Sequence, residues 1–187
     1  NMITGKDIVI DPNPILRTKC DKVTFPISEE LKATAKEMRQ HIINSLDEEL
    51  CEKYDLTPAV GLAAPQINLN AQLCCVYITG EDEKGNEETI DLTMLNPRIM
   101  AYSEEKVYLE QGEACLSIKE KHEGYVPRPA YIKVKYYDLD GQEHLHEAYD
   151  FEAIAIQHEI DHLNGILFYD HINKQNPFAK VPNSFAL

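Results

Sequence analysis

The segment from residue 150 to residue 165, DFEAIAIQHEIDHLNG, constrains the fold of this chain more than any other stretch. Small or apolar residues recur in it at helical spacing, at Ala153, Ile156, Ile160 and Leu163. This spacing predicts a helix that is largely buried. We expect Asp150 to cap its first turn and Gly165 to lie just past its end. A buried helix needs cover on several sides, so we expect it at the centre of the fold.

The same segment carries His158, Glu159 and His162 in the order H-E-x-x-H. On a helix, side chains four residues apart lie on one face, with their Cβ atoms about 6 Å apart. Two imidazoles placed in this way can bind one metal ion, and the glutamate beside them can reach an attacking water. The pattern indicates a metal-dependent hydrolase, but it leaves the third ligand and the scissile bond open.

The third ligand separates the hydrolase classes. A thermolysin-like protease needs a glutamate well downstream of the second histidine, and only Asp170 and His171 follow Gly165 as candidates, too early in the chain. A metzincin needs a third histidine where this chain has Phe168. Both protease patterns therefore fail. Upstream, Cys115 lies on a predicted strand between small residues, and its thiolate is a candidate ligand that spacing alone does not decide.

The rest of the chain predicts strands in runs and one further helix. The helix is expected over 28–49, with Ser28 as its cap. Strands are expected over 71–79, 89–99 and 105–118, a charged hairpin tip over 81–88, a hairpin over 131–149 and an irregular tail over 173–187. Strands in runs beside two helices indicate an α+β fold. The length of 187 residues suits a single domain, residues 1–187.

Charge and cysteine content narrow the function classes. A formal net charge of −14 argues against binding nucleic acid, which needs lysine and arginine to neutralise phosphates. The chain contains no run of about 18 apolar residues, so no membrane-spanning helix is predicted, and no signal peptide is expected. The cysteines number five, an odd number, and are irregularly spaced. This argues against a disulfide framework and fits a reducing cytoplasm. Cys74 and Cys75 are expected on opposite faces of their strand.

Three stretches in order, AVGLAAPQ at 59–66, EACLS at 113–117 and QHEIDHLNG at 157–165, resemble the motifs of peptide deformylase. GYVPR at 124–128 and the loop at 81–88 resemble the second, Gram-positive-type class of this bacterial family. The resemblance implies an α+β fold in which antiparallel or mixed β-sheets surround a central helix carrying H-E-x-x-H. It implies hydrolysis of the formyl group from the N-terminal formylmethionine of newly made polypeptides, with release of formate.

The resemblance also implies roles for single residues. One divalent metal ion, natively Fe²⁺ and replaceable by Zn²⁺, Ni²⁺ or Co²⁺, would be held by Cys115, His158 and His162. Glu159 would take a proton from the attacking water and give it to the leaving amine. The Gln66 side-chain amide and the Leu116 backbone N–H would donate hydrogen bonds to the oxyanion.

For the substrate, the resemblance places Val60, Gly61 and Ala114 along the peptide backbone, with Arg128 further out and Glu113 supporting a ligand. Leu116 and Ile154 are candidate walls of the methionine pocket. The expected partner is a formylmethionyl peptide or nascent chain in the cytoplasm, with a transient contact to the ribosome. Neither membrane attachment nor sequence-specific nucleic-acid binding is expected.

Other interpretations remain open from the sequence. Ala59 and Ala114 stand where the family usually has glycine, so a related protein that binds metal but has weak or different amidase activity is one alternative. A purely structural metal site is another, although it leaves Glu159 and Gln66 without a use.

Overall fold

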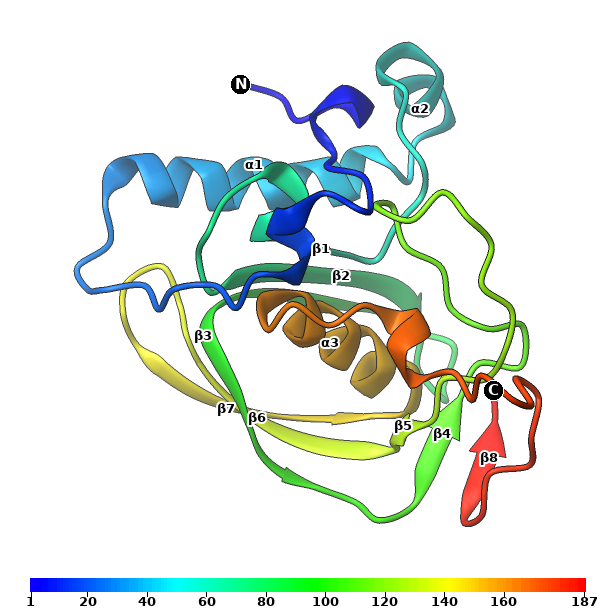
Figure 1. The fold of residues 1–187 in the computed structure, drawn as a ribbon. Coiled ribbons are helices and arrows are strands. Elements are labelled where there is room, and N and C mark those ends of the chain that lie inside the picture. Colours follow the sequence, from blue (N-terminus) through cyan, green and yellow to red (C-terminus); the bar gives the residue numbers. More distant parts are fainter.

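The computed structural model describes all residues, 1–187, and shows an α+β fold in which two sheets surround a central helix (Figure 1). The α-helices are α1 (Glu29–Asn44), α2 (Glu48–Tyr54) and α3 (Asp150–Leu163). The strands are β1 (Gly61–Ala63), β2 (Leu73–Glu81), β3 (Glu87–Tyr102), β4 (Lys106–Tyr108), β5 (Arg128–Pro129), β6 (Tyr131–Tyr137), β7 (Glu143–Tyr149) and β8 (Ser184–Ala186). Short 3₁₀ helices cover Gly5–Asp7, Pro14–Arg17, Ala64–Ile67 and Phe168–His171.

The larger sheet is antiparallel, with strand order β1-β2-β3-β6-β7, and it curves around α3 (Figure 1). The smaller sheet has the order β5-β4-β8, and its β4–β8 pair is parallel. Helix α1 packs on the outer side of β2. The expected α+β fold with mixed sheets around a central helix is confirmed.

Strand β2 lies between two apolar layers. Cys74 packs in the cluster that includes Ile156 and Leu163 of α3, whereas Cys75 packs with Met38 of α1. The two neighbouring cysteines therefore point to opposite faces, as predicted, because side chains alternate along a strand. All five cysteines are free.

Helix α3 is buried along most of its length, as its pattern predicts. Its start differs from the prediction: Asp150 is the first helical residue, Tyr149 occupies the cap position, and no side-chain cap is formed. Gly165 follows the end of the helix with φ +73°, and a Cβ there would lie 2.6 Å from the Arg17 carbonyl oxygen. Only glycine fits this turn without strain.

Helix α1 begins as predicted, with the Ser28 hydroxyl accepting a hydrogen bond from the Leu31 N–H at 3.0 Å. It ends at Asn44 and not at 49 as expected. The Ser45 hydroxyl bonds back to the Ile42 carbonyl, and Asp47 caps α2, so the chain turns between the two helices. Leu46 falls in this turn and is 47% exposed.

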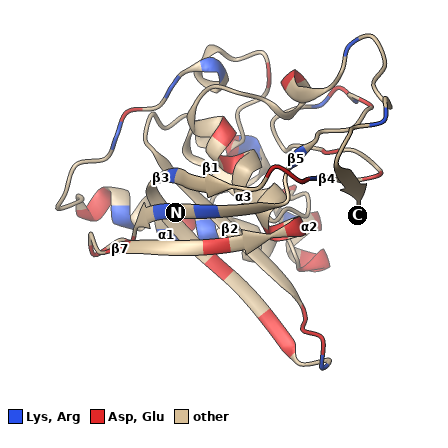
Figure 2. Ribbon diagram, turned by 90° about the horizontal axis from the view of Figure 1, so that it is seen from below, with Lys and Arg blue, Asp and Glu red and all other residues tan.

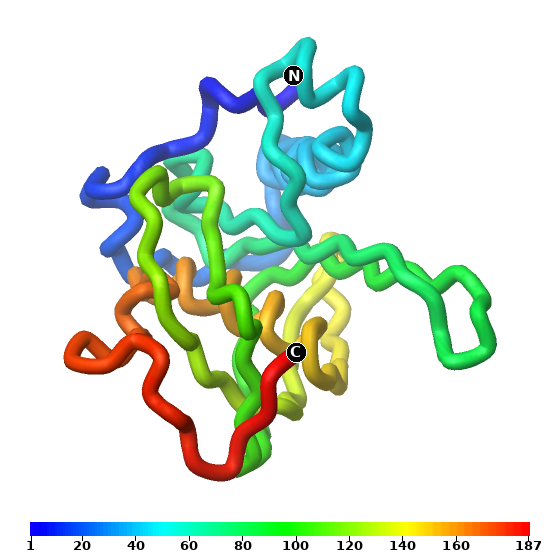
Figure 3. Tube along the Cα trace, turned by 90° about the vertical axis from the view of Figure 1, so that its right-hand side faces the viewer, coloured from blue at the N-terminus to red at the C-terminus, as the bar shows by residue number.

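Both predicted hairpins are present. The charged residues between β2 and β3 form an exposed tip that projects far from the body of the molecule (Figure 3). Strands β6 and β7 pair over 131–149 as expected. Strand β3 runs on through Pro97, and its pairing with β6 shifts in register between Leu95 and Arg98.

Two predictions at the smaller sheet are wrong. Only Lys106–Tyr108 of the expected strand 105–118 is extended, and Cys115 lies in an irregular loop. A turn follows β4, in which the Gly112 N–H donates to the Leu109 carbonyl at 2.9 Å and Gly112 adopts φ +80°. The tail is not wholly irregular, because its last residues form β8 beside β4. Phe178 contacts Tyr125 edge-to-face at 5.3 Å between ring centroids and helps to hold the tail.

Acidic residues are spread over many elements, including both strands of the β2–β3 hairpin (Figure 2). None of the helices combines the length and the apolar character that crossing a membrane requires.

Candidate active site

The centre of the site is formed by three side chains from two elements. The ligating atoms of Cys115, His158 and His162 lie within 4.8 Å of one another. The Cys115 sulfur is 3.2 Å from Nε2 of His162. The two imidazoles lie one turn apart on α3, with ring centroids separated by 5.2 Å. Helical spacing therefore brings the histidines together, and the fold adds the thiol from the 109–118 loop.

These residues fit a divalent metal ion. One thiolate and two imidazoles are common ligands of zinc and iron, and three protein ligands leave a position for water or substrate. The His158 Nδ1 atom lies 2.9 Å from the Glu113 carboxylate, which leaves Nε2 for the metal. A carboxylate behind a ligating histidine is the usual arrangement, because it fixes the tautomer and the orientation of the ring.

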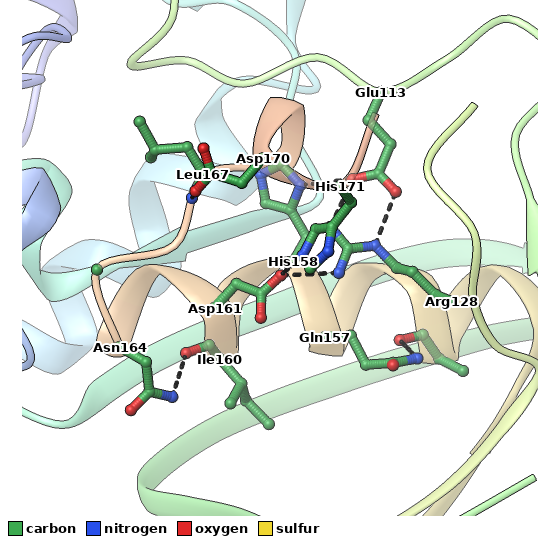
Figure 4. Close-up of polar contacts among 12 residues, drawn as sticks. Glu113, Arg128, Gln157, His158, Ile160, Asp161, Asn164, Leu167, Asp170 and His171 are labelled. Carbon is green, nitrogen blue, oxygen red and sulfur yellow. Dashed lines mark hydrogen bonds and ion pairs between the residues drawn. The ribbon is translucent and has the colours of Figure 1, made fainter. Parts of the chain in front are cut away.

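A buried network of charges supports His158 (Figure 4). The Arg128 guanidinium donates to both Glu113 carboxylate oxygens, at 2.8 and 3.0 Å, and to Asp161 at 2.9 Å. The same Asp161 oxygen lies 2.8 Å from Nε2 of His171. The network thus runs from the 109–118 loop through β5 to α3 and the following turn. Glu113 thus bonds to a candidate metal ligand, the position that the sequence suggested for it.

The network sets the charge states in the site. Burial opposes ionisation of Glu113, but hydrogen bonds from His158 and Arg128 outweigh it and lower the Glu113 pKa to about 2. Burial lowers the pKa of His162 well below its usual value, so this imidazole is neutral at physiological pH, as a metal ligand must be. Burial also opposes the charge of His158, but hydrogen bonds to Cys115 and Glu113 outweigh it and raise the His158 pKa well above its usual value. In the metal-free site His158 is therefore protonated, and a metal ion bound at Nε2 would displace that proton.

Arg128 is buried, although contact with the substrate peptide, its predicted role, requires it to be accessible. It is 3% exposed, and its guanidinium is occupied by Glu113 and Asp161. It does not line the main cavity, so the expectation that it meets the substrate peptide is corrected: its partners hold it beneath the site. The sequence predicts no role for Asp161, and His171 was considered only as a third metal ligand and rejected. The position of Asp161 one turn after His158 was the only signal for either residue.

Glu159 lies beside the ligands and faces the cavity. It is 4% exposed, and one of its carboxylate oxygens, Oε1, has no hydrogen-bond partner. Burial raises the pKa of Glu159 to about 7, although the positive charges of His158 and Arg128 pull it down. A carboxyl group with a pKa near 7 can both accept and return a proton at neutral pH.

Gln66 is held rigidly next to Cys115. Its Oε1 atom accepts a hydrogen bond from the Ala63 N–H at 2.9 Å, so its Nε2 atom points toward the 109–118 loop. There Nε2 donates to the Ser117 hydroxyl at 3.2 Å and to the Cys115 sulfur at 3.5 Å. An amide donor fixed in this way needs no reorganisation to stabilise a developing negative charge.

A cavity of about 520 Å³ opens onto these groups. It is mostly apolar, and the predicted substrate-contacting residues Val60, Gly61, Ala114, Leu116 and Ile154 line it. The sequence analysis missed Phe151 and gave Leu46 no role at the site, yet both line this cavity. Both are large apolar side chains that are partly exposed, 38% and 47%, but no sequence motif places them at the site.

Residues 5–178 match the family described as polypeptide deformylase. The chain belongs to this family. Peptide deformylase 2 of Bacillus cereus is 45% identical over 186 residues, which cover 100% of this chain and 99% of that protein. The peptide deformylase of Pediococcus pentosaceus is 48% identical over 188 residues, with 100% of both chains covered.

Solved structures agree with this assignment. The crystal structure of plant peptide deformylase PDF1B has a TM-score of 0.71 and 32% identity, covering 90% of this chain and 80% of that one. The crystal structure of peptide deformylase from Thermotoga maritima has a TM-score of 0.66 and 31% identity, covering 89% of this chain and 96% of that one. The chain is thus a metal-dependent deformylase-family hydrolase, and the comparisons give no support to a paralogue with a different activity.

Proposed function

We propose that this deformylase hydrolyses the formyl group of N-terminal formylmethionine on newly made polypeptides and releases formate. The observation that carries the proposal is the position of Glu159. Its buried carboxyl group, with a pKa near 7, lies beside the Cys115, His158 and His162 cluster at an apolar cavity. A structural metal site would need neither this acid nor the cavity.

Cys115, His158 and His162 would hold one divalent metal ion, with Fe²⁺ proposed as the native ion and Zn²⁺, Ni²⁺ or Co²⁺ as substitutes. When bound, such an ion supplies Lewis acidity and lowers the pKa of water toward about 7. Glu113 keeps His158 oriented, and Arg128 keeps Glu113 ionised. The thiolate makes the centre sensitive to oxidation.

The remaining residues divide the work of the hydrolysis. Glu159 removes a proton from the attacking water and delivers it to the leaving amine, steps that are typically worth about 10² to 10⁴ in rate. The Gln66 amide and the Leu116 backbone N–H donate to the oxygen of the formyl group as negative charge develops on it. Each donor of this kind typically contributes about 10² to 10³ in rate.

The substrate would add to an edge of the larger sheet. β1 is the terminal strand, paired only with β2, and Val60 directly precedes it. An extended peptide can lie along this free edge, in the cavity that Ala114 also lines. Leu116 and Ile154 provide apolar surface for the methionine side chain. We place the reaction in the cytoplasm on nascent chains, with a transient contact to the ribosome as a further part of the proposal.

The test is formate release from formyl-Met-Ala-Ser. We expect turnover with this peptide and none with acetyl-Met-Ala-Ser, because the additional methyl crowds the carbon that is attacked. Cleavage of an internal bond in a blocked peptide would indicate an endopeptidase. Absence of formate release from metal-loaded protein would contradict the proposal.

A further inference from the structure

Gly61 has a neighbour that its sequence motif does not reveal. A Cβ atom built on Gly61 would lie 2.7 Å from Cδ and 2.8 Å from Cγ of Glu159, and closer still to its Oε2 atom. Real Cβ atoms do not approach other heavy atoms to such distances. The outer half of the Glu159 side chain therefore occupies the space that any side chain at position 61 would need.

Glu159 has little freedom to avoid such a contact. Its side chain is buried, and Gly61 belongs to β1, which is fixed by its pairing with β2 through Val76. The contact involves Cγ and Cδ as well as the carboxylate oxygen, so rotation of the carboxylate alone does not relieve it. The open space beside Glu159 is the cavity. A side chain at 61 would thus move the carboxyl group off β1 and into the space for the substrate.

We propose that Gly61 is a positioning residue: it has no side chain because the carboxyl group of Glu159 must lie against β1, in reach of the attacking water. This inference rests on the proposed function. It assigns Gly61 a role different from close approach of the substrate backbone, the role that the sequence motif suggests. The two roles predict different kinetics.

Gly61→Ala separates them by its kinetic effects. If the methyl displaces Glu159, kcat falls by at least about tenfold, because the interaction lost is one made in the transition state. KM also rises, since the displaced carboxyl group enters the cavity, so the fall in kcat is the deciding measurement. If Gly61 serves only the approach of the substrate, KM rises and kcat is retained. Metal content is expected to equal that of the wild type. The matched control is Gly80→Ala on β2, where an added Cβ meets nothing within 4 Å and kinetics should not change.

A double-mutant cycle tests the contact without using activity. Gly61→Ala is made in the wild type, in Glu159→Gln, which keeps the volume of the side chain, and in Glu159→Ala, which removes it. We expect the thermal midpoint to fall by a few degrees in the first two backgrounds and not in the third. An equal change in all three backgrounds, or a raised KM at unchanged kcat, would overturn the inference.

Failure of the proposed function and failure of the positioning role of Gly61 give different results. If the wild type released no formate, the proposed function would be lost, and the cycle would still report whether residue 61 meets Glu159. If the wild type is active and the cycle is additive, the function stands and the role of Gly61 is refuted.

Discussion

Two regions supply the candidate metal ligands, and they are built in opposite ways. Helix α3 presents His158 and His162 from regular backbone, one turn apart, inside the larger sheet. The 109–118 loop presents Cys115 from irregular backbone, where the Cys115 carbonyl accepts a hydrogen bond from the Ile118 N–H at 3.1 Å. The helix orders its ligands through its own hydrogen bonds, whereas the loop depends on contacts with the rest of the fold.

Several of those contacts are made by residues of the site. Glu113, in the same loop, bonds to His158 and to Arg128, and the Cys115 sulfur meets His162 and Gln66. The loop is thus tied to α3 by the residues of the site itself. We therefore expect substitution of Glu159 on α3 to act on chemistry while the fold and the metal are retained. Substitutions in the loop, or of the residues that hold it, are expected to act on metal binding and stability.

The largest expected effect is on chemistry, at α3. Glu159→Gln should keep the fold and the metal but lower kcat by about 10² to 10⁴, because the amide cannot carry a proton. Formate release and metal content are measured on the same preparation. A variant within about tenfold of the wild-type kcat would exclude Glu159 as the acid–base group.

The next effect is on metal binding, at the loop. Cys115→Ser should lose most of its metal at an unchanged content of secondary structure, because a neutral hydroxyl is a much poorer ligand than a thiolate. Cys51→Ser is the matched control, since Cys51 is a free cysteine in α2 outside the cluster. The metal content of both variants is measured after dialysis. Full retention of the metal by Cys115→Ser would refute ligation by the thiolate.

The third effect is on stability and concerns the link between the two regions. Arg128→Met leaves Glu113 buried without its main counter-charge, which typically costs about 3 to 5 kcal/mol. Arg39→Met is the control, because Arg39 makes a similar bidentate pair with Asp91 at the surface, where such pairs are worth about 0 to 1 kcal/mol. Urea unfolding compares them, and equal losses would show that burial of the Arg128 network is unimportant.

The contrast between helix and loop also explains which features the sequence could predict. The α3 histidines, the two-sided β2 and both hairpins follow from periodic patterns that local backbone geometry imposes. The conformation around Cys115 does not, because the turn at Gly112 and the bonds of Glu113 depend on distant residues. The parallel pairing of β8 with β4 joins segments about 80 residues apart and has no local signal.

The structural roles of the buried charged residues could not be predicted from the sequence either. Arg128 follows Pro127 in a stretch without periodicity, so its sequence gave no indication of burial, and the structure assigns it two carboxylate partners. The motif identifies Glu159 as the acid–base group. It does not reveal that the Glu159 side chain fills the space that a side chain at Gly61 would need. The motifs thus predict which residues reach the site. The contacts that hold those residues in position depend on tertiary packing, which the motifs do not reveal.

A smaller effect concerns pH and the stability of metal-free protein. Burial raises the folded-state pKa of Glu159 from 4.5 to about 7, so the folded form binds this proton more tightly than the unfolded form. The resulting stability is fully present below pH 4.5, falls as pH rises to about 7 and then stays constant. The shift corresponds to about 3 kcal/mol. Glu159→Gln should lack this component, and unfolding curves of both proteins from pH 4.5 to 8 measure the difference.

The smallest effect is expected at Ala114, beside the loop ligand. Its side chain lines the cavity, where the methyl can crowd the substrate backbone. In Ala114→Gly this crowding is removed, which should raise kcat/KM for formyl-methionyl peptides about fivefold. That factor corresponds to roughly 1 kcal/mol of transition-state stabilisation. The added freedom of glycine in the unfolded chain should cost about 0.4 to 1 kcal/mol of stability. If the methyl does not meet the substrate, kcat/KM stays at or below the wild-type value and only stability falls. Because α3 is untouched, an increase in kcat/KM at constant metal content would show that the loop limits turnover through substrate fit, independently of its role in holding the metal.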